Sequence, residues 1–325
     1  MKKILVIRFS SIGDIVLASP VIRCLREQVP GCELHFLTKK QYHPLVSGNP
    51  NLDKIYLYER NFHDLIPLLQ AEKYDFITDL HRNYRSWYIR SRLLRRSGSF
   101  PKLNIRKWIF VRLKLNLLPP VHLVDRYFHA VQKLDVRYDG KGLDYYIPPD
   151  EEIRVGELFP GTEKGFIAFA IGARHSTKLL PPEKVTGVCE KAGKPVILLG
   201  GKEDVERGRE ILGQTGGNVH NGCGILSLSQ SASVIRQADA LITNDTGMMH
   251  IGAAFRKKIV SVWGNTVPAF GMYPLYPEGM GHLGRIVEVK GLRCRPCSKL
   301  GYSRCPKGHF NCMNWINTCE ITEAL

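Results

Sequence analysis

The chain has 325 residues, of which 44% are hydrophobic and 23% are charged. A chain of this length is usually too long to fold around one hydrophobic core, so we predict two domains of about 150 residues each. The composition excludes a disordered or fibrous chain. No apolar run approaches the roughly 18 residues of a membrane span, and Arg8 ends the first apolar run too early for a signal peptide. We therefore expect a cytoplasmic protein.

The formal net charge of +16 is concentrated in one segment. Between Arg82 and Lys114 the chain has eleven Lys or Arg residues and no Asp or Glu. Aromatic residues such as Trp87 and Trp108 are interleaved with these cations, which predicts amphipathic helices. Such a segment attracts polyanions, namely nucleic acid, anionic lipid headgroups or a phosphorylated glycolipid.

Predicted strands alternate with predicted helices in both halves of the chain, which indicates parallel sheets covered on both faces. We expect strands at 3–9, 34–38, 54–58, 76–80, 166–171, 195–199, 240–243 and 259–263. A segment rich in proline and glycine, 147–165, predicts the linker. The expected fold class is α/β, with two doubly wound, Rossmann-like domains at 1–150 and 151–325. Ligands of such domains bind at the carboxyl ends of the strands, so a cleft between the domains is expected to hold the chemistry.

The loop after the first predicted strand contains Ser10, Ser11, Gly13 and Asp14. A single glycine is too few for the G-x-G-x-x-G fingerprint, which disfavours a nicotinamide oxidoreductase. Asp14 has two interpretations. It is either an acid that favours the helix dipole at a helix start, or a general base that takes a proton from an attacking hydroxyl.

The segment from Asn244 to His250 directly follows another predicted strand. A strand that ends in Asp245-Thr246-Gly247 and opens a helix presents free backbone N–H groups, which bind phosphate. Thr246 and His250 are four residues apart and share a helix face, so the imidazole could reach the same diphosphate. The alternative for His250 is an ordinary surface or core histidine.

Two further loops carry charged candidates. Lys178 follows the first predicted strand of the second domain, where an ammonium group could neutralise a departing diphosphate. Glu203 and Asp204 follow the Gly200-Gly201 turn, where an acid commonly holds a ribose hydroxyl. The alternatives are a solvated surface lysine and ordinary acids at a helix start.

These segments together resemble glycosyltransferase family 9, the lipopolysaccharide heptosyltransferases. The resemblance lies in the opening run through Ser10, Ser11 and Asp14, in the Lys178 loop, in the Gly200-Gly201 turn and in 244–254, and it continues in order to about residue 265. It implies a GT-B fold of two facing domains, with the acceptor bound by the first and ADP-heptose by the second.

The resemblance also implies roles for single residues. Asp14 falls on the catalytic base and Lys178 on the diphosphate lysine. Asp245, Thr246, Gly247 and His250 fall on the motif that binds the sugar donor. Glu203 and Asp204 fall near the ribose contact, and Glu206 lies within the same turn, so the resemblance leaves open which of the three acids makes it. The family inverts the anomeric centre without a metal, so we expect no cofactor and no catalytic metal.

Acceptor binding is expected from Ser10, Ser11, Gly13, Arg82 and Arg85. The stretch 82–114 is the least family-like part of the chain. The simpler interpretation of this stretch is a solvated basic face. Its charge favours instead a surface that binds a phosphorylated glycolipid and the inner leaflet of the membrane, so the protein would be a peripheral membrane protein. Leu179-Leu180-Pro181 also departs from the Trp-Pro that the family usually has after its lysine.

Five of the nine cysteines are crowded into the tail, namely Cys294, Cys297, Cys305, Cys312 and Cys319. The spacing of the first four, with His309 between them, makes a structural zinc physically reasonable. Buried thiols or a stress-induced disulfide remain alternatives.

Three rival functions remain open. The first is the same fold with another nucleotide sugar, because no motif identifies the sugar. The second is a nucleic-acid-binding protein, supported only by the basic stretch. The third is a non-catalytic sensor of nucleotide sugars, which the presence of a candidate base disfavours.

Overall fold

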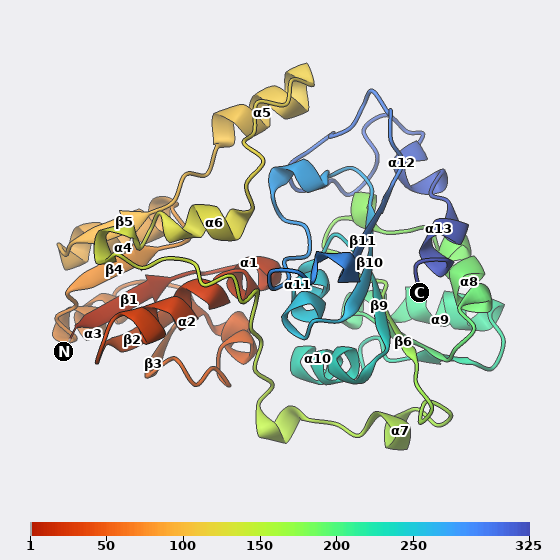
Figure 1. Cartoon of the computed structure of the whole chain (residues 1–325), viewed down its shortest axis with the longest axis horizontal. Helices are drawn as coiled ribbons and strands as arrows, with labels where there is room; N and C mark the ends of the chain where they lie inside the picture. Colours follow the sequence, from red (N-terminus) through yellow and green to blue (C-terminus); the bar gives the residue numbers. More distant parts are fainter. Residues whose placement is uncertain (1) are drawn as a thin grey trace. The chain divides into compact units, whose positions relative to one another are not determined.

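The computed structural model describes residues 2–325, which form two compact units (Figure 1). The first unit contains the chain up to Lys102 and then Val121–Pro148. The second contains Leu103–Pro120 and Pro149–Leu325. None of the helices in residues 2–325 combines the length and the apolar character that crossing a bilayer requires.

The first unit is built on a five-stranded parallel sheet with the order β3-β2-β1-β4-β5. Its strands are β1 (Lys3–Ile7), β2 (Glu33–Lys39), β3 (Lys54–Tyr58), β4 (Phe76–Asp79) and β5 (Ser97–Ser99). Its helices are α1 (Ile12–Val16), α2 (Ser19–Gln28), α3 (Leu65–Ala71), α4 (Tyr84–Leu93) and α6 (Leu123–Phe128). This strand order is that of a doubly wound nucleotide-binding sheet.

The second unit has a six-stranded parallel sheet with the order β11-β10-β9-β6-β7-β8. Its strands are β6 (Ile167–Ala170), β7 (Val196–Leu199), β8 (Val219–Asn221), β9 (Ala240–Asn244), β10 (Lys258–Trp263) and β11 (Gly284–Glu288). Counted within the unit, the order again reverses between the first strand, β6, and the fourth, β9. The sheet is therefore also doubly wound.

Helices cover both faces of the second sheet. Figure 1 shows α8 (Pro182–Lys191), α9 (Val205–Gln214) and α13 (Thr318–Thr322) on one face, and α10 (Leu228–Gln237) and α11 (Gly247–Ala254) on the other. The unit also contains α5 (Asn104–Leu113), α7 (Val155–Leu158) and α12 (Asn311–Asn314). Because both faces are covered, the central strands are buried throughout and consist of continuous apolar runs.

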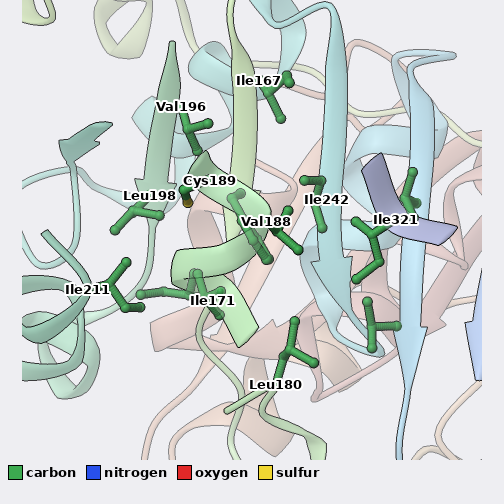
Figure 2. Close-up of a cluster of buried hydrophobic side chains, with 14 of the residues drawn as sticks. Ile167, Ile171, Leu180, Val188, Cys189, Val196, Leu198, Ile211, Ile242 and Ile321 are labelled. Carbon is green, nitrogen blue, oxygen red and sulfur yellow. The ribbon is translucent and has the colours of Figure 1, made fainter. Parts of the chain in front are cut away.

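The core of the second unit joins these layers (Figure 2). Val188 and Cys189 of α8 pack with strand residues such as Ile242, and Ile321 of α13 packs into the same cluster. The carboxyl-terminal tail therefore forms part of the core, in which Cys312 is also buried.

All eight predicted strands are present, and three short strands were not predicted: β5, β8 and β11. The predicted α/β class is confirmed by the two parallel sheets. The reversal points of strand order lie between β1 and β4 in the first unit and between β6 and β9 in the second. The loops that follow these four strands are thus the places where a doubly wound sheet binds its ligand.

Candidate active site

Asp14 lies on α1, in the loop region that follows β1 at the reversal point of the first sheet. One carboxylate oxygen, Oδ2, accepts hydrogen bonds from the backbone N–H of Ser11 at 3.1 Å and from its hydroxyl at 2.8 Å. The other, Oδ1, is 2.5 Å from Nη2 of Arg8, and the Tyr127 hydroxyl is 3.5 Å away. Asp14 thus closes a capping box and also belongs to a buried charged cluster.

Arg8 controls the protonation of Asp14. Burial alone would raise the pKa of this carboxyl, but the Arg8 guanidinium and the two Ser11 hydrogen bonds hold its pKa below the ordinary value. Arg8 itself is buried, donates to the carbonyl of Leu80 and lies 5.6 Å from the centre of the Tyr127 ring. The carboxylate is therefore ionised and fixed in orientation.

His81 follows β4, on the other side of the same reversal point. Burial, together with the positive charges of Arg8 and Lys102, lowers its pKa to about 3. The imidazole is therefore neutral at physiological pH. A neutral ring at this reversal point can hydrogen-bond to a hydroxyl without adding charge.

The predicted acceptor residues divide into two groups. Gly13 is buried inside α1, whereas Ser10 is half-buried and Ser11 is exposed and occupied with Asp14. Arg82 is exposed and donates to the carbonyl of Phe100 at 2.7 Å, and Arg85 is exposed on α4.

Arg85 also lines a pocket of about 580 Å³ at the carboxyl ends of β2 and β3. Its lining residues are Lys39, Lys40, Gln41, Tyr58, Glu59, Arg60 and Arg85. Four of these seven side chains are cationic and one is acidic. The first unit thus contains a basic pocket of a size suited to a phosphorylated sugar.

Lys178 and Asp245 meet at the reversal point of the second sheet. Lys178 ends a short 3₁₀-helix after β6, and its Nζ donates to Asp245 Oδ2 at 2.6 Å and to the Asp245 carbonyl at 3.0 Å. The Thr266 hydroxyl, which follows β10, donates to the same Oδ2 at 2.7 Å. The loops that follow β6, β9 and β10 are thereby connected around the Lys178 ammonium group.

The N-terminus of α11 lies directly beside this ion pair. Thr246 is its N-cap residue, in extended backbone, and its side chain does not cap the helix but lies 3.3 Å from the hydroxyl of Thr243. Gly247 begins the helix, and His250 is buried within it. The first N–H groups of α11 together with the Lys178 ammonium form an arrangement suited to an anion such as a diphosphate.

The three acids after β7 differ in their surroundings. Asp204 is buried and accepts a hydrogen bond from the N–H of Gly201 at 2.9 Å, and burial raises its pKa. Glu206 is exposed and pairs with Arg209. Glu203 is exposed at the start of the same helical segment. Glu203 and Glu206 are therefore open to solvent, whereas Asp204 is occupied by the turn.

One further acidic cluster has the geometry of a metal site. Glu33, His35 and Glu72 have ligand atoms within 4.8 Å of one another. Lys3 and Lys54 form ion pairs with Glu72 at 2.6 and 2.7 Å, and hydrogen bonds from these two side chains and from Tyr56 lower its pKa to about 2. The two ammonium groups already supply the positive charge that a metal would bring, so this cluster is a structural ion-pair network.

Sequence reasoning missed Arg8, Tyr127 and Thr266 as members of these two clusters. The sequence did offer a sign that Arg8 is special: it is a cation directly after an apolar strand, and the structure buries it. No sequence feature pointed to Tyr127 or Thr266, because only the fold brings Tyr127 to Asp14 and Thr266 to Asp245.

Comparison with known proteins identifies the family. The model of glycosyltransferase family 9 (heptosyltransferase) matches residues 63–299, which is more than half of the chain. The chain belongs to glycosyltransferase family 9. It is therefore a glycosyltransferase, as the sequence motifs predicted.

Individual relatives of this family 9 protein are distant but cover most of it. Lipopolysaccharide heptosyltransferase 1 of Campylobacter coli is 24% identical over 81% of this chain and 84% of its own length. A solved family 9 glycosyltransferase of Veillonella parvula superposes with a TM-score of 0.72 at 22% identity, over 88% of this chain and 85% of that one.

The structure of E. coli ADP-heptose lps heptosyltransferase II also has a TM-score of 0.72, at 20% identity, over 100% of this chain and 97% of that one. These similarities confirm the predicted GT-B fold of the family 9 chain.

Proposed function

We propose that this enzyme transfers a heptose from ADP-heptose to a lipopolysaccharide core or a related glycolipid, with inversion and without a catalytic metal ion. One observation carries the proposal. The reversal point of the first sheet holds an ionised carboxylate, Asp14, and that of the second holds an ammonium group, Lys178, beside a helix N-terminus. These are the two charges that inverting transfer from a sugar diphosphate requires.

In the proposed reaction an acceptor hydroxyl gives its proton to Asp14 while its oxygen bonds to the anomeric carbon. The bond from that carbon to the diphosphate oxygen breaks on the opposite face, and ADP leaves with the electron pair. Lys178 and the N–H groups of α11 stabilise the departing charge. Asp245 and Thr266 hold the ammonium group in place for this role.

ADP-heptose is proposed as the sugar donor because the printed names of the relatives include lipopolysaccharide heptosyltransferases and an ADP-heptose enzyme. The exposed Glu203 is the proposed ribose contact, and the buried Asp204 supports the Gly200-Gly201 turn. The alternative is the same chemistry with another nucleotide sugar, because no residue of the second unit identifies the sugar itself.

The acceptor is proposed to bind the first unit. Arg82 and Arg85 are exposed, and the pocket that includes Arg85, Lys39 and Arg60 presents cations to a phosphorylated core sugar. Ser10 and Ser11 lie next to Asp14 and are proposed to contact the hydroxyl that is glycosylated.

Peripheral binding to the cytoplasmic face of an anionic membrane is proposed through α5. Phe110 anchors this helix by packing edge-on against Phe270. Ile105 and Trp108 are 76% and 57% exposed, and Arg106 and Arg112 are exposed between and beside them. Exposed apolar side chains among cations suit an anionic lipid interface.

The donor assignment is tested by calorimetry at fixed salt with ADP, UDP and GDP, together with an RNA oligomer. Preference for ADP supports ADP-heptose as the donor. Preference for UDP or GDP would keep the fold and change the sugar donor. Tight, salt-sensitive RNA binding without nucleotide binding would favour the nucleic-acid alternative and overturn the proposed transfer from ADP-heptose.

Turnover of ADP-heptose is then followed with Asp14→Asn and, as the matched control, with Asp64→Asn, which changes an exposed carboxylate of the same unit. Asp14→Asn should abolish transfer while ADP affinity stays nearly unchanged, because the substitution lies in the other unit from the nucleotide site. Normal turnover by Asp14→Asn would show that the base is misassigned. The anomeric configuration of the product, determined by NMR, tests inversion.

The α5 proposal is tested by co-sedimentation with vesicles. Vesicles of phosphatidylglycerol should bind the protein, vesicles of phosphatidylcholine should not, and Trp108→Ala with Ile105→Ala should reduce binding. Equal binding by the double variant would refute a role for α5. Transfer to a soluble, deacylated acceptor should be unaffected by these substitutions.

A further inference from the structure

The segment between β11 and α12 is irregular and rich in cysteine. Residues 289–310 form neither helix nor strand, yet they contain Cys294, Cys297 and Cys305, and Cys312 follows on α12. The spacing is C-x2-C-x7-C-x6-C. An irregular segment of this length has no hydrogen-bonded helix or strand to fix its conformation, so other interactions must hold it in place.

Three of the four cysteines lie in this irregular segment, and the fourth, Cys312, is buried directly after it. Cys297 Sγ donates to the carbonyl of Cys294 at 3.0 Å. Burial raises the pKa of the Cys297 thiol to about 12, and the Cys294 and Cys312 thiols raise it further. Burial likewise raises the pKa of Cys312 to about 11, with smaller contributions in the same direction from Cys294 and Cys305. Within the set, the hydrogen bond from Cys297 to Cys294 closes the C-x2-C turn.

This segment is bonded to the loops that hold Lys178 and Asp245. The N–H of Cys297 donates to the carbonyl of Asn265 at 3.1 Å, and Arg295 donates to the carbonyl of Thr266 at 2.9 Å. Thr266 is the hydroxyl donor to Asp245. The cysteine segment therefore supports one side of the diphosphate site.

The same segment supports the other side through Tyr302. The N–H of Thr177 donates to the Tyr302 carbonyl at 3.2 Å, and the Tyr302 N–H donates to the Thr177 hydroxyl at 2.8 Å. Thr177 directly precedes Lys178. Ordering of the cysteine segment thus orders both the lysine loop and the Thr266 loop.

We propose that Cys294, Cys297, Cys305 and Cys312 bind one zinc ion through four thiolates, and that this structural site holds the two loops around Lys178. The site itself is independent of the proposed reaction. Only the second part, its effect on nucleotide binding, depends on the proposed function.

The chemistry of the four side chains fits a structural zinc site. Four cysteines with a C-x2-C pair are a common ligand set for tetrahedral zinc, with Zn–S bonds of about 2.3 Å. A four-thiolate zinc centre carries a net charge of about −2. Lys114 Nζ lies 3.0 Å from the Cys294 carbonyl and 2.7 Å from that of Pro296, and Arg295 lies in the same loop. These cations offset the negative charge.

Metal binding requires a local rearrangement of the thiols. Across residues 2–325 no three cysteine sulfurs lie within 4.8 Å of one another, so the side chains must turn inward to close a tetrahedron. Three of the four lie in the irregular segment, so a change of side-chain rotamer there does not require a helix or strand to break. Binding would release the thiol protons.

The site is tested first by elemental analysis of the full-length protein purified without a metal-affinity tag. About one zinc per chain is expected, and Cys294→Ser with Cys297→Ser should lose it. Cys319→Ser is the control, because Cys319 is an exposed cysteine of the same tail. Cobalt substitution should give the intense absorption of a tetrahedral thiolate centre. Iron bound by the same cysteines would support the thiolate site and change only the ion.

A metal-free protein with correct folding would overturn the proposal. So would mass spectrometry that finds the four cysteines paired in disulfides, or metal content that survives the double substitution. Because metal content is measured on the wild-type chain as well, a variant that fails to fold does not decide the result.

The link to the diphosphate site is tested by ADP calorimetry. Loss of the metal should weaken ADP binding by about tenfold or more, the size seen when the support of a functional site is removed. Unchanged ADP affinity in a metal-free variant would refute the link and leave the metal site standing. Zinc in a chain that binds no nucleotide at all would instead refute the proposed function.

Discussion

Arg8 Nη2 lies 2.5 Å from Asp14 Oδ1, so a buried guanidinium sits on one face of the candidate base. This pairing lowers the pKa of the carboxyl although burial acts in the opposite direction. The carboxylate is therefore a weaker base than an ordinary aspartate, but it is ionised at neutral pH and is held by Arg8 and Ser11.

Replacing Arg8 should therefore change the pH dependence of transfer. In Arg8→Met burial remains and the compensating charge is gone, so the pKa of Asp14 should rise. The acid limb of kcat/KM, which reports the free enzyme, should then move to higher pH. Arg8→Lys should restore part of the wild-type profile. A parallel loss of activity at every pH would mean that Arg8 has only a structural role.

Lys178 and Asp245 should act as one unit. Lys178→Ala should lower kcat by about a hundredfold, because it removes a charge that stabilises the departing diphosphate. Asp245→Asn should also reduce kcat, since the ammonium loses its 2.6 Å partner. The double variant should be little worse than Lys178→Ala alone. Lys191→Ala, at the exposed end of α8, is the control. Strictly additive effects would contradict the coupling.

The strands could be predicted because their apolar runs are buried on both faces, as in β1 and β6. β5 could not, because Ser97–Ser99 has no apolar residue. Asp14, Lys178 and Asp245 could be named from the loops after predicted strands. Tyr127 could not be joined to Asp14 from sequence, because 113 residues separate them and only the fold brings α6 to that loop. The catalytic roles themselves remain predictions.

His81 should make the first unit less stable in acid. Its pKa is lowered to about 3 by burial and by Arg8, whereas an unfolded histidine titrates near 6.5. Between these values the unfolded chain binds a proton that the folded chain does not. The free energy of unfolding should therefore rise with pH across this window.

Urea unfolding of wild type and His81→Asn at several pH values between about 4.5 and 7 checks this. The variant should have the smaller slope of stability against pH, and the difference between the two slopes removes contributions from other groups. If both proteins gave the same slope, the pKa of His81 would not be lowered in the folded protein.

Gly172, in the loop after β6, should tolerate no side chain. A Cβ at this position would lie 2.1 Å from Asp204 Oδ2, and Asp204 is buried and bonded to the Gly201 N–H. Gly172→Ala should therefore destabilise the protein by about 1–3 kcal/mol, the usual cost of overpacking. It should also weaken ADP binding, because displacing Asp204 disturbs the turn that carries Glu203.

Gly187→Ala is the matched control, since a Cβ there meets nothing within 4 Å and α8 gains helix propensity. Denaturant unfolding and ADP calorimetry measure both effects. Unchanged stability in Gly172→Ala would mean that Asp204 can move at little cost, and unchanged ADP affinity despite lost stability would separate this turn from the nucleotide site.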